Sequence, residues 1–250
     1  MRVTQSASRY PERKRRSASQ WRTSRWRQVL HVLLLLILFG RLLSGSSRLS
    51  FTADEPSHIA SGYAFLARGA TWTVPLRGHP LLLNVWLVLP FYLGNPHIPL
   101  ETLPGWLDDN TRYVQGFVPY IRENVRAAEV ATRVPVMLLT LLLAAVVIRW
   151  ARDLWDPVRG PIGSIGALLA LSFDPTLLAH GMLATNDIGT TALGTTALWL
   201  THRLVKRPKP IRAAVAGGVL GLTILSKGSG VIWLAGALAM LGIAFLRNGV

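Results

Sequence analysis

Apolar residues along this chain are gathered into long blocks separated by shorter polar stretches. The first block runs from residue 29 to about residue 45, and it contains seven consecutive apolar residues from Leu33 to Phe39. At a rise of about 1.5 Å per residue, a helix over this block just spans a hydrocarbon core about 30 Å thick. Five further blocks cover residues 131–150, 162–178, 188–200, 213–226 and 231–246. The pattern therefore predicts an all-α, polytopic transmembrane bundle with six crossings.

One long polar stretch, residues 47–128, separates the first block from the others. Together with Glu129 just past its end, it accounts for seven of the twelve acidic residues. Within it, residues 79–94 are apolar and aromatic, with Pro80 near the start and Pro90 near the end. This segment is too short to span a bilayer comfortably, so we expect a juxtamembrane helix in the outer interface. A full crossing is the alternative, and it would invert every later loop.

The positive charge of the chain decides between these two topologies. The net charge of +15 would suit nucleic-acid binding, but the basic residues cluster at the edges of apolar blocks, as expected for cytoplasmic loops. With the segment at 79–94 kept outside, all the basic turns face the cytoplasm. These are Arg149, Arg152 and Arg159, then Arg203, Lys206, Arg207, Lys209 and Arg212, then Arg247. The alternative topology places the same residues outside, so we favour the first and expect no nucleic-acid partner.

The expected organisation follows from that topology. Residues 1–28 form a basic cytoplasmic tail, 29–46 the first transmembrane helix, 47–128 an extracytoplasmic loop with juxtamembrane helices, and 129–250 transmembrane helices 2–6. The tail is expected to be solvated beside anionic lipid headgroups, with nucleic-acid binding by this short arm as the minor alternative. Because the chain stops just after a crossing, we expect a multi-pass cell-membrane protein truncated at its C-terminus.

Few residues in this pattern can carry chemistry, and those that can are expected at the outer surface. Asp54 and Glu55 open the outer loop, where paired carboxylates can act as a base or bind a cation, or can be ordinary solvated acids. Asp187 lies at the outer end of a long apolar hairpin, so it is either functional or the cap of the next helix. Lys227 interrupts an apolar stretch and either snorkels or contacts a lipid phosphate.

Other chemistries are poorly supported by the sequence. The chain has no cysteine, which excludes disulfides, zinc thiolates and thiol catalysis. It shows no dinucleotide-binding glycine motif, Walker loop, HExxH or nucleophile elbow. His58, His79 and His180 are each weak signals alone, and Asp174-Pro175 predicts a kink or a helix end.

Taken in order, several short motifs resemble the amino-terminal half of a lipid-carrier-dependent glycosyltransferase of the GT-C class, in the superfamily of protein O-mannosyltransferases and aminoarabinose transferases. The motifs are Asp54-Glu55-Pro56-Ser57-His58, Gly78-His79-Pro80-Leu81, Thr132-Arg133-Val134-Pro135, Phe173 to Gly181, Leu183 to Asp187, and Leu225-Ser226-Lys227-Gly228. Together they span about residues 30 to 235, and the ordered set is more specific than any member.

The resemblance implies sugar transfer from a polyprenyl phosphate or pyrophosphate donor to an acceptor at the outer membrane face. It makes Asp54 the general base, with Glu55 orienting the site or helping to bind a cation and Asp187 converging on Asp54. Lys227 and Arg133 are expected to face the donor phosphate. The expected substrate-binding residues are His58, His79, Arg133, His180 and Lys227, and a divalent cation, if one is bound, is expected on Asp54 and Asp187.

The sequence also departs from the family pattern, which keeps two other functions open. Relatives often carry an acid before the second His-Pro motif, whereas Gly78 precedes His79 here, and this puts a metal site in doubt. A transporter or flippase for a lipid-linked or polar substrate is the alternative function, and a non-catalytic membrane subunit is the third. Acids at the outer ends of helices favour surface chemistry over transport.

Overall fold

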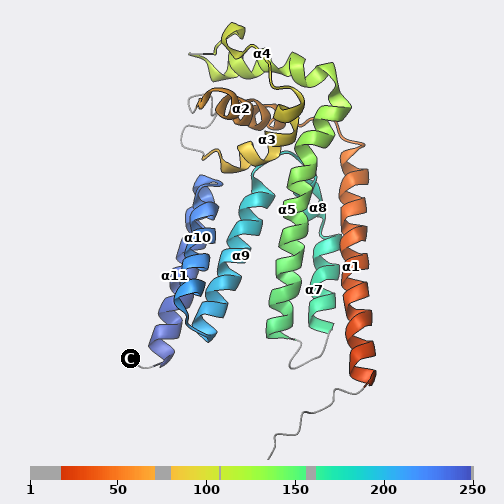
Figure 1. Ribbon diagram of the computed structural model, residues 1–250, viewed down its shortest axis with the longest axis vertical. Helices are drawn as coiled ribbons and strands as arrows, with labels where there is room; N and C mark the ends of the chain where they lie inside the picture. Colours follow the sequence, from red (N-terminus) through yellow and green to blue (C-terminus); the bar gives the residue numbers. More distant parts are fainter. Residues whose placement is uncertain (1–17, 71–79, 107, 156–161, 249–250) are drawn as a thin grey trace, which may run out of the picture.

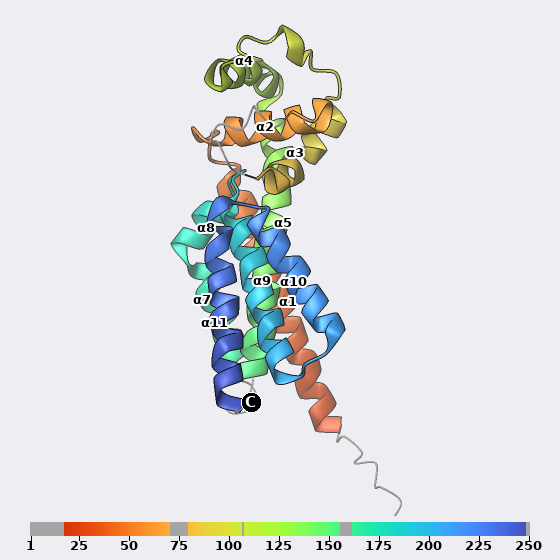
Figure 2. The same ribbon diagram turned by 90° about the vertical axis from the view of Figure 1, so that its left-hand side faces the viewer.

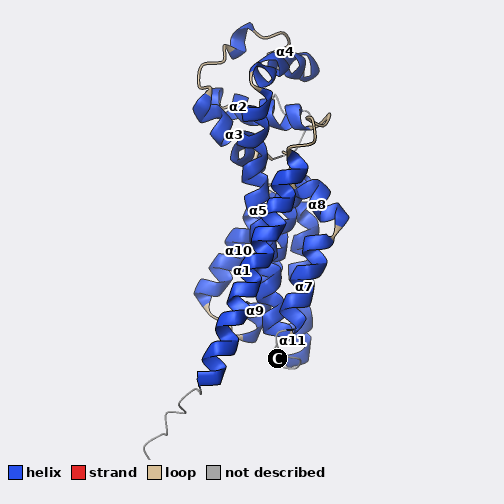
Figure 3. Cartoon of the chain, turned by 90° about the vertical axis from the view of Figure 1, so that its right-hand side faces the viewer, coloured by secondary structure: helices blue, strands red, loops and turns tan. Residues whose placement is uncertain are grey.

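The structure is a bundle of long helices capped at one end by shorter ones. This computed structural model describes residues 18–70, 80–106, 108–155 and 162–248. Throughout those ranges every regular element is a helix, and Figure 3 shows helix and loop alone there. The all-α fold class predicted from the apolar blocks is confirmed.

Six helices lie side by side and form the bundle (Figures 1 and 2). They are α1 (Ala18–Ser46), α5 (Val125–Leu154), α7 (Ile162–Phe173), α9 (Asp187–Lys206), α10 (Pro210–Ile224) and α11 (Val231–Asn248). Helix α5 lies in the middle, in contact with α1 and α7 on one side and with α9 on the other, while α10 and α11 pack on α9. Any group on α5 or α9 is therefore held by several neighbours.

Four further helices lie across one end of the bundle, and we call them the cap (Figure 1). They are α2 (Glu55–Arg68), α3 (Leu82–Gly94), the short 3₁₀ helix η1 (Leu100–Thr102) and α4 (Asn110–Glu123). The apolar segment at 79–94 thus provides a helix, α3, that lies across the end of the bundle and not alongside the bundle helices.

The cap has a core of its own, built mainly from aromatic rings. Tyr63 on α2 lies with its ring centroid 5.2 Å from those of both Tyr92 and Phe117, so it joins α3 to α4. The Tyr113 hydroxyl donates to the carbonyl of Ala60 at 3.1 Å and closes the same core. Because burial of one large apolar side chain contributes about 1.5–3 kcal/mol, this cluster makes the cap a firm platform.

Length and apolar composition limit which helices can cross a membrane alone. In the described part of the chain, α1, α5 and α11 meet both requirements, and α7 with α8 (Pro175–Gly181) makes a fourth if the pair counts as one span. Helices α9 and α10 lie alongside these but do not meet them, so six crossings stay a prediction. The pair α7–α8 bends by 64° at Asp174, whose carboxylate caps α8 by accepting from the N–H of Leu177 at 2.7 Å.

Two helix boundaries differ from those expected. Helix α1 begins at Ala18, inside the stretch expected as a basic tail, and α5 begins at Val125, before the apolar block at 131. Apolar composition marks where a helix meets lipid, whereas a helix ends where its backbone is capped. For α5 that point is Asn124, whose side-chain oxygen accepts from the N–H of Ala127 at 3.1 Å.

Large apolar side chains face outward along the bundle. Ile162, Ile211, Ile232 and Leu246 are each at least 69% exposed, and similar residues follow the outer faces of α1 and α11. A protein in water rarely exposes contiguous apolar surface on this scale, whereas lipid tails cover it without cost. The outer faces of the bundle therefore suit a membrane.

Candidate functional site

Two of the ion pairs at the bundle end that carries the cap involve residues singled out from the sequence. One joins Glu55, the first residue of α2, to Arg133 on α5. The other joins Asp187, the first residue of α9, to Lys227, which follows α10. Both pairs connect segments far apart in the chain, and they differ sharply in their surroundings.

The Glu55–Arg133 pair is completely buried. Both side chains are 0% exposed, and the two bonds of the pair are 2.8 Å from Nε to Oε1 and 2.9 Å from Nη2 to Oε2. This two-bond geometry matches the planar fork of a guanidinium to a carboxylate.

Every N–H of the Arg133 guanidinium has an acceptor. Besides the two bonds to Glu55, Nη1 donates to the carbonyls of Ser46 and Leu49 at 3.0 and 2.9 Å, and Nη2 donates to the carbonyl of Ser50 at 3.0 Å. Since a guanidinium has five N–H donors, these five bonds use all of them. The arrangement leaves no N–H of Arg133 for a donor phosphate, the role expected from the sequence.

The carboxylate of Glu55 is equally occupied. Oε1 also accepts from the backbone N–H of Ala184, and Oε2 from that of Thr52, each at 2.8 Å. Burial alone raises the pKa of Glu55, but the hydrogen bonds from Arg133, Ala184 and Thr52 outweigh it, so the pKa lies below the ordinary value of 4.5. Glu55 is thus a charged anchor that joins the end of α1, the start of α2, α5 and the loop before α9.

Asp54 is adjacent in sequence but lies in the opposite environment. It is exposed, and its side chain does not cap α2. Because Glu55 is fixed beside it, the backbone at Asp54 is held while its carboxylate remains free to meet a ligand. An accessible carboxylate on a fixed backbone is what a general base requires.

His58, one turn further along α2, is held against α3. The amide oxygen of Asn84 accepts from its Nδ1 at 3.1 Å. Gly62 makes this close packing of helices feasible, because a Cβ there would lie 2.3 Å from the Asn84 carbonyl oxygen. Asn84 was not singled out from the sequence, although a lone amide within an apolar helix was a signal that could have found it.

The electrostatics of His58 connect the two loops of the site. Burial lowers the pKa of His58 below its ordinary value of 6.5, against the Asn84 hydrogen bond and the carboxylates of Asp54 and Asp187, which raise it. The ammonium of Lys227 lowers it further. The charges of Asp54, Asp187 and Lys227 all therefore act on one imidazole, and that imidazole is mostly neutral at pH 7.

Asp187 and Lys227 form the second pair, which is partly open to solvent. Lys227 Nζ lies 2.5 Å from Asp187 Oδ1, with side-chain exposures of 31% and 44%. His180, at the end of α8, brings its Nδ1 to 3.7 Å from Asp187 Oδ2. Lys227 has no acid close to it in the sequence, and its partner, Asp187, lies 40 residues earlier in the chain.

A buried hydroxyl pair fixes the position of Lys227. The Ser226 hydroxyl donates to that of Thr190 at 2.9 Å, and Thr190 lies one turn after Asp187 on α9. Gly230 permits the tight turn that follows, because a Cβ there would lie 2.4 Å from the carbonyl oxygen of Thr223. Ser226 therefore contacts Thr190, and the next residue, Lys227, contacts Asp187, one turn earlier on α9.

Asn186 precedes α9, but its side chain does not cap the helix. It is 2% exposed, and within the described residues neither atom of its amide has a hydrogen-bond partner. Asp187 lies in the first turn of α9, where a negative charge is favourable beside the free N–H groups.

The described residues offer little support for a metal centre. They contain no group of three or more His, Asp or Glu side chains placed to hold a metal ion. Asp187, one of the two expected ligands, has the ammonium of Lys227 against one carboxylate oxygen. A divalent cation on Asp54 and Asp187 stays a prediction, and His79, expected to bind substrate, lies outside the described residues.

Comparison with known proteins adds the family. A family model described as dolichyl-phosphate-mannose-protein mannosyltransferase matches residues 111–248, which is more than half of the chain. The chain belongs to this family. No curated protein and no solved structure matches it.

Membership of the mannosyltransferase family confirms the resemblance to GT-C glycosyltransferases found in the motifs. Together with the apolar helices, it identifies a membrane glycosyltransferase that uses a lipid-linked sugar donor. The match includes Arg133, His180, Asp187 and Lys227 but begins after Asp54, Glu55 and His58. The roles of the three earlier residues therefore depend on the structure and the motifs alone.

Proposed function

We propose that this protein transfers a sugar from a polyprenyl-phosphate carrier to an acceptor hydroxyl at the outer membrane face, with Asp54 as general base. The observation that carries the proposal is that the buried Glu55 carboxylate accepts from the N–H of Thr52, beside Asp54, and from the N–H of Ala184, before Asp187, which holds these two segments together. Asp54 supplies an exposed carboxylate at the first segment, and Lys227, which follows α10 and pairs with Asp187, supplies a partly exposed cation for a phosphate at the second.

The proposed reaction needs a base and a phosphate-binding cation on opposite sides of the sugar. The bond from the anomeric carbon to the carrier phosphate oxygen breaks, and its electron pair leaves with the phosphate. The acceptor oxygen bonds to the anomeric carbon while its proton passes to the Asp54 carboxylate. A positioned base of this kind contributes about 10²–10⁴-fold to the rate.

Lys227 is the proposed contact for the leaving phosphate. Its ammonium is already partly desolvated and directed by the Ser226–Thr190 bond, so a phosphate can share it with Asp187 at little reorganisation cost. His180, 46% exposed on the other side of Asp187, is a second polar contact available to the donor.

Glu55 and Arg133 are proposed as positioning residues. Their hydrogen bonds hold the backbone on both sides of the site, at Thr52 beside Asp54 and at Ala184 before Asp187. Because neither side chain is exposed, they act on the reaction by fixing the two loops in register. No step of the proposed reaction passes through a metal ion.

The orientation is part of the proposal. The N-terminus and the basic turns are placed in the cytoplasm, and the cap is placed outside, which follows the charge bias of the loops. Since the chain has no cysteine, single cysteines at positions 54, 187 and 247 report sidedness directly. Labelling by an impermeant maleimide of the first two but not the third is expected in intact cells. Labelling of positions 54 and 187 from opposite sides would exclude a shared site.

The test of catalysis is Asp54→Asn in the full-length protein, assayed with defined polyprenyl-phosphate sugars. We expect the rate of sugar transfer to fall by about 10²–10⁴-fold. Asp108→Asn is the matched control, because Asp108 is another exposed acid of the cap. Wild-type activity in Asp54→Asn, with the control also active, would remove Asp54 as the base.

The alternative function, transport or flipping of a lipid-linked substrate, is less well supported. Coupling residues of transporters are expected near the middle of a span, whereas Asp54 precedes α2 and Asp187 is the first residue of α9. Carrier translocation by the Asp54→Asn variant at the wild-type rate, together with lost transfer, would separate the two functions.

A further inference from the structure

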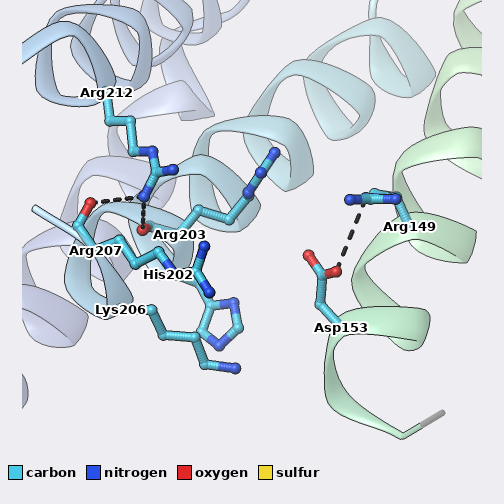
Figure 4. A pocket seen from close by; sticks show the side chains of 7 residues that line it. All are labelled: Arg149, Asp153, His202, Arg203, Lys206, Arg207 and Arg212. Atoms are coloured by element: carbon cyan, nitrogen blue, oxygen red, sulfur yellow. Dashed lines mark hydrogen bonds and ion pairs between the residues drawn. The ribbon is translucent and has the colours of Figure 1, made fainter. Parts of the chain in front are cut away.

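A second polar site lies at the bundle end opposite the cap. It is a cavity of about 310 Å³ between the end of α5, the end of α9 and the start of α10. Figure 4 shows the side chains that line it, which are Arg149, Asp153, His202, Arg203, Lys206, Arg207 and Arg212.

The cavity is strongly positive, with five Lys and Arg side chains and one acid. That acid, Asp153, is already engaged, because it accepts from Trp199 Nε1 at 3.2 Å and lies 3.8 Å from Arg149 Nε. Lys206 and Arg207 have no acidic partner within the described part of the chain. An unneutralised cluster of this kind attracts an anion.

The pocket is also organised and not merely charged. Arg212 Nη1 donates to the carbonyl of Arg207 at 2.7 Å, which ties the start of α10 to the end of α9. The guanidinium of Arg203 lies over the ring of Trp199, 5.1 Å from its centroid. These contacts hold two arginines in place at the wall and leave Lys206 and Arg207 available.

Among the described residues, His202, which lines the cavity, and Trp150, whose ring lies near that of His202, each have a buried nitrogen without a hydrogen-bond partner. In the described ranges, His202 Nδ1 and Trp150 Nε1 make no hydrogen bond, and their rings lie 6.0 Å apart. A buried polar nitrogen without a hydrogen bond is unfavourable, so the His202 nitrogen at the cavity wall favours a ligand with a polar atom that pairs with it.

We propose that this cavity binds the phosphate headgroup of an anionic phospholipid. Phosphate oxygens suit the arginine forks and the lysine ammonium, and they supply acceptors to nearby N–H groups. The pocket opens between membrane helices at their polar ends, where lipid headgroups lie. A general preference for positive charge on one side of the membrane explains the number of cations. It does not explain why side chains of three helices converge on one cavity.

Binding is tested with the purified full-length protein in nanodiscs and by native mass spectrometry of retained lipid. The probes are dioleoylphosphatidylglycerol and dioleoylphosphatidylcholine, with soluble glycerol phosphate as a third arm. The test variant is the double substitution Lys206→Gln, Arg207→Gln. The control is Lys209→Gln, Arg247→Gln, which removes two exposed charges outside the cavity lining.

We expect the wild type and the control to retain phosphatidylglycerol over phosphatidylcholine, and the test variant to lose about tenfold or more of that preference. Equal losses in the two variants would show that only general surface charge attracts the lipid, and would overturn the site. Tight binding of glycerol phosphate, lost in the test variant alone, would keep the phosphate site but overturn the lipid as its occupant. A wild type without headgroup preference would also overturn it.

Discussion

The two acid–base pairs beneath the cap are alike in chemistry and opposite in surroundings. Glu55 and Arg133 are fully buried, and their polar atoms are all bonded within the protein. Asp187 and Lys227 are about one third to one half exposed and are joined by a single contact. The first pair is suited to hold backbone segments together, and the second is suited to exchange one partner for a ligand.

The same contrast separates two neighbours in the sequence. Asp54 and Glu55 differ by one position, yet one is exposed and the other is 0% exposed. The Glu55 carboxylate accepts two hydrogen bonds from Arg133, one from Ala184 and two from the N–H and hydroxyl of Thr52, and it cannot take part in proton transfer without breaking them, whereas the Asp54 carboxylate is exposed. Fixation and accessibility are divided between adjacent residues, so the proposed base, Asp54, need not be held by its own side chain.

The largest expected effect comes from breaking the buried pair. Arg133→Leu leaves Glu55 charged and unpaired in the interior, so we expect a loss of about 3–5 kcal/mol in the free energy of unfolding. Arg68→Leu is the control, because both side chains of its pair with Glu101 are about half exposed, at 50% and 52%, and an exposed ion pair contributes little to stability. Thermal unfolding in detergent measures both. Equal stability of the two variants would contradict the structural role.

Breaking the partly exposed pair of Asp187 and Lys227 should have the opposite effect, with a large loss of activity and a small loss of stability. Lys227→Gln removes the proposed phosphate contact, and we expect kcat to fall by about 10²–10³-fold, while the free energy of unfolding changes by less than about 1 kcal/mol. Steady-state kinetics with a polyprenyl-phosphate sugar, alongside thermal unfolding, give both quantities. A large loss of stability with unchanged kcat would show that Lys227, like Arg133, has a structural role and does not contact the donor phosphate.

The smallest effect is a difference in acid sensitivity. Because the pKa of Glu55 is lowered by folding, its ionised form stabilises the protein above the ordinary value of 4.5, and this stability is lost as the pH falls below it. Glu55→Gln should therefore be less stable at pH 7 and lose less on acidification. Unfolding curves from pH 7 to pH 3.5 compare the slopes, and identical slopes would show that the buried carboxylate does not titrate in this range.

Apolar blocks were sufficient to predict much of the bundle. Their lengths and order indicated the helices, and Asp174-Pro175 marked the place where α7 bends into α8, because proline and a capping carboxylate act locally. Helix starts such as Val125 were missed, since polar residues extend a helix beyond the membrane until a cap ends it. Features such as caps and bends can be predicted from the sequence when the residues that cause them lie within a few positions of each other.

The pairing of the site residues was much harder to predict. Glu55 and Arg133 were each singled out from the sequence, and Arg133 was expected to bind the substrate. Nothing in either motif shows that the two side chains, 78 positions apart in the chain, form an ion pair. The same holds for Lys227 and Asp187, and for the Ser226–Thr190 bond that positions them. Such contacts depend on how α2, α5, α9 and α10 pack, which composition does not encode.

The saturated guanidinium of Arg133 also bears on how the protein is assembled. Its acceptors come from the last residue of α1, from the linker after it and from α2, all made before α5 on the ribosome. An arginine that enters lipid without these acceptors has a high free-energy cost. We therefore expect α5 to reach its final position only after the end of α1, the linker and the start of α2 have reached theirs. On this view, Arg133 sets the order of membrane insertion, because α5 packs against its neighbours only after the segments that bind its guanidinium are in place.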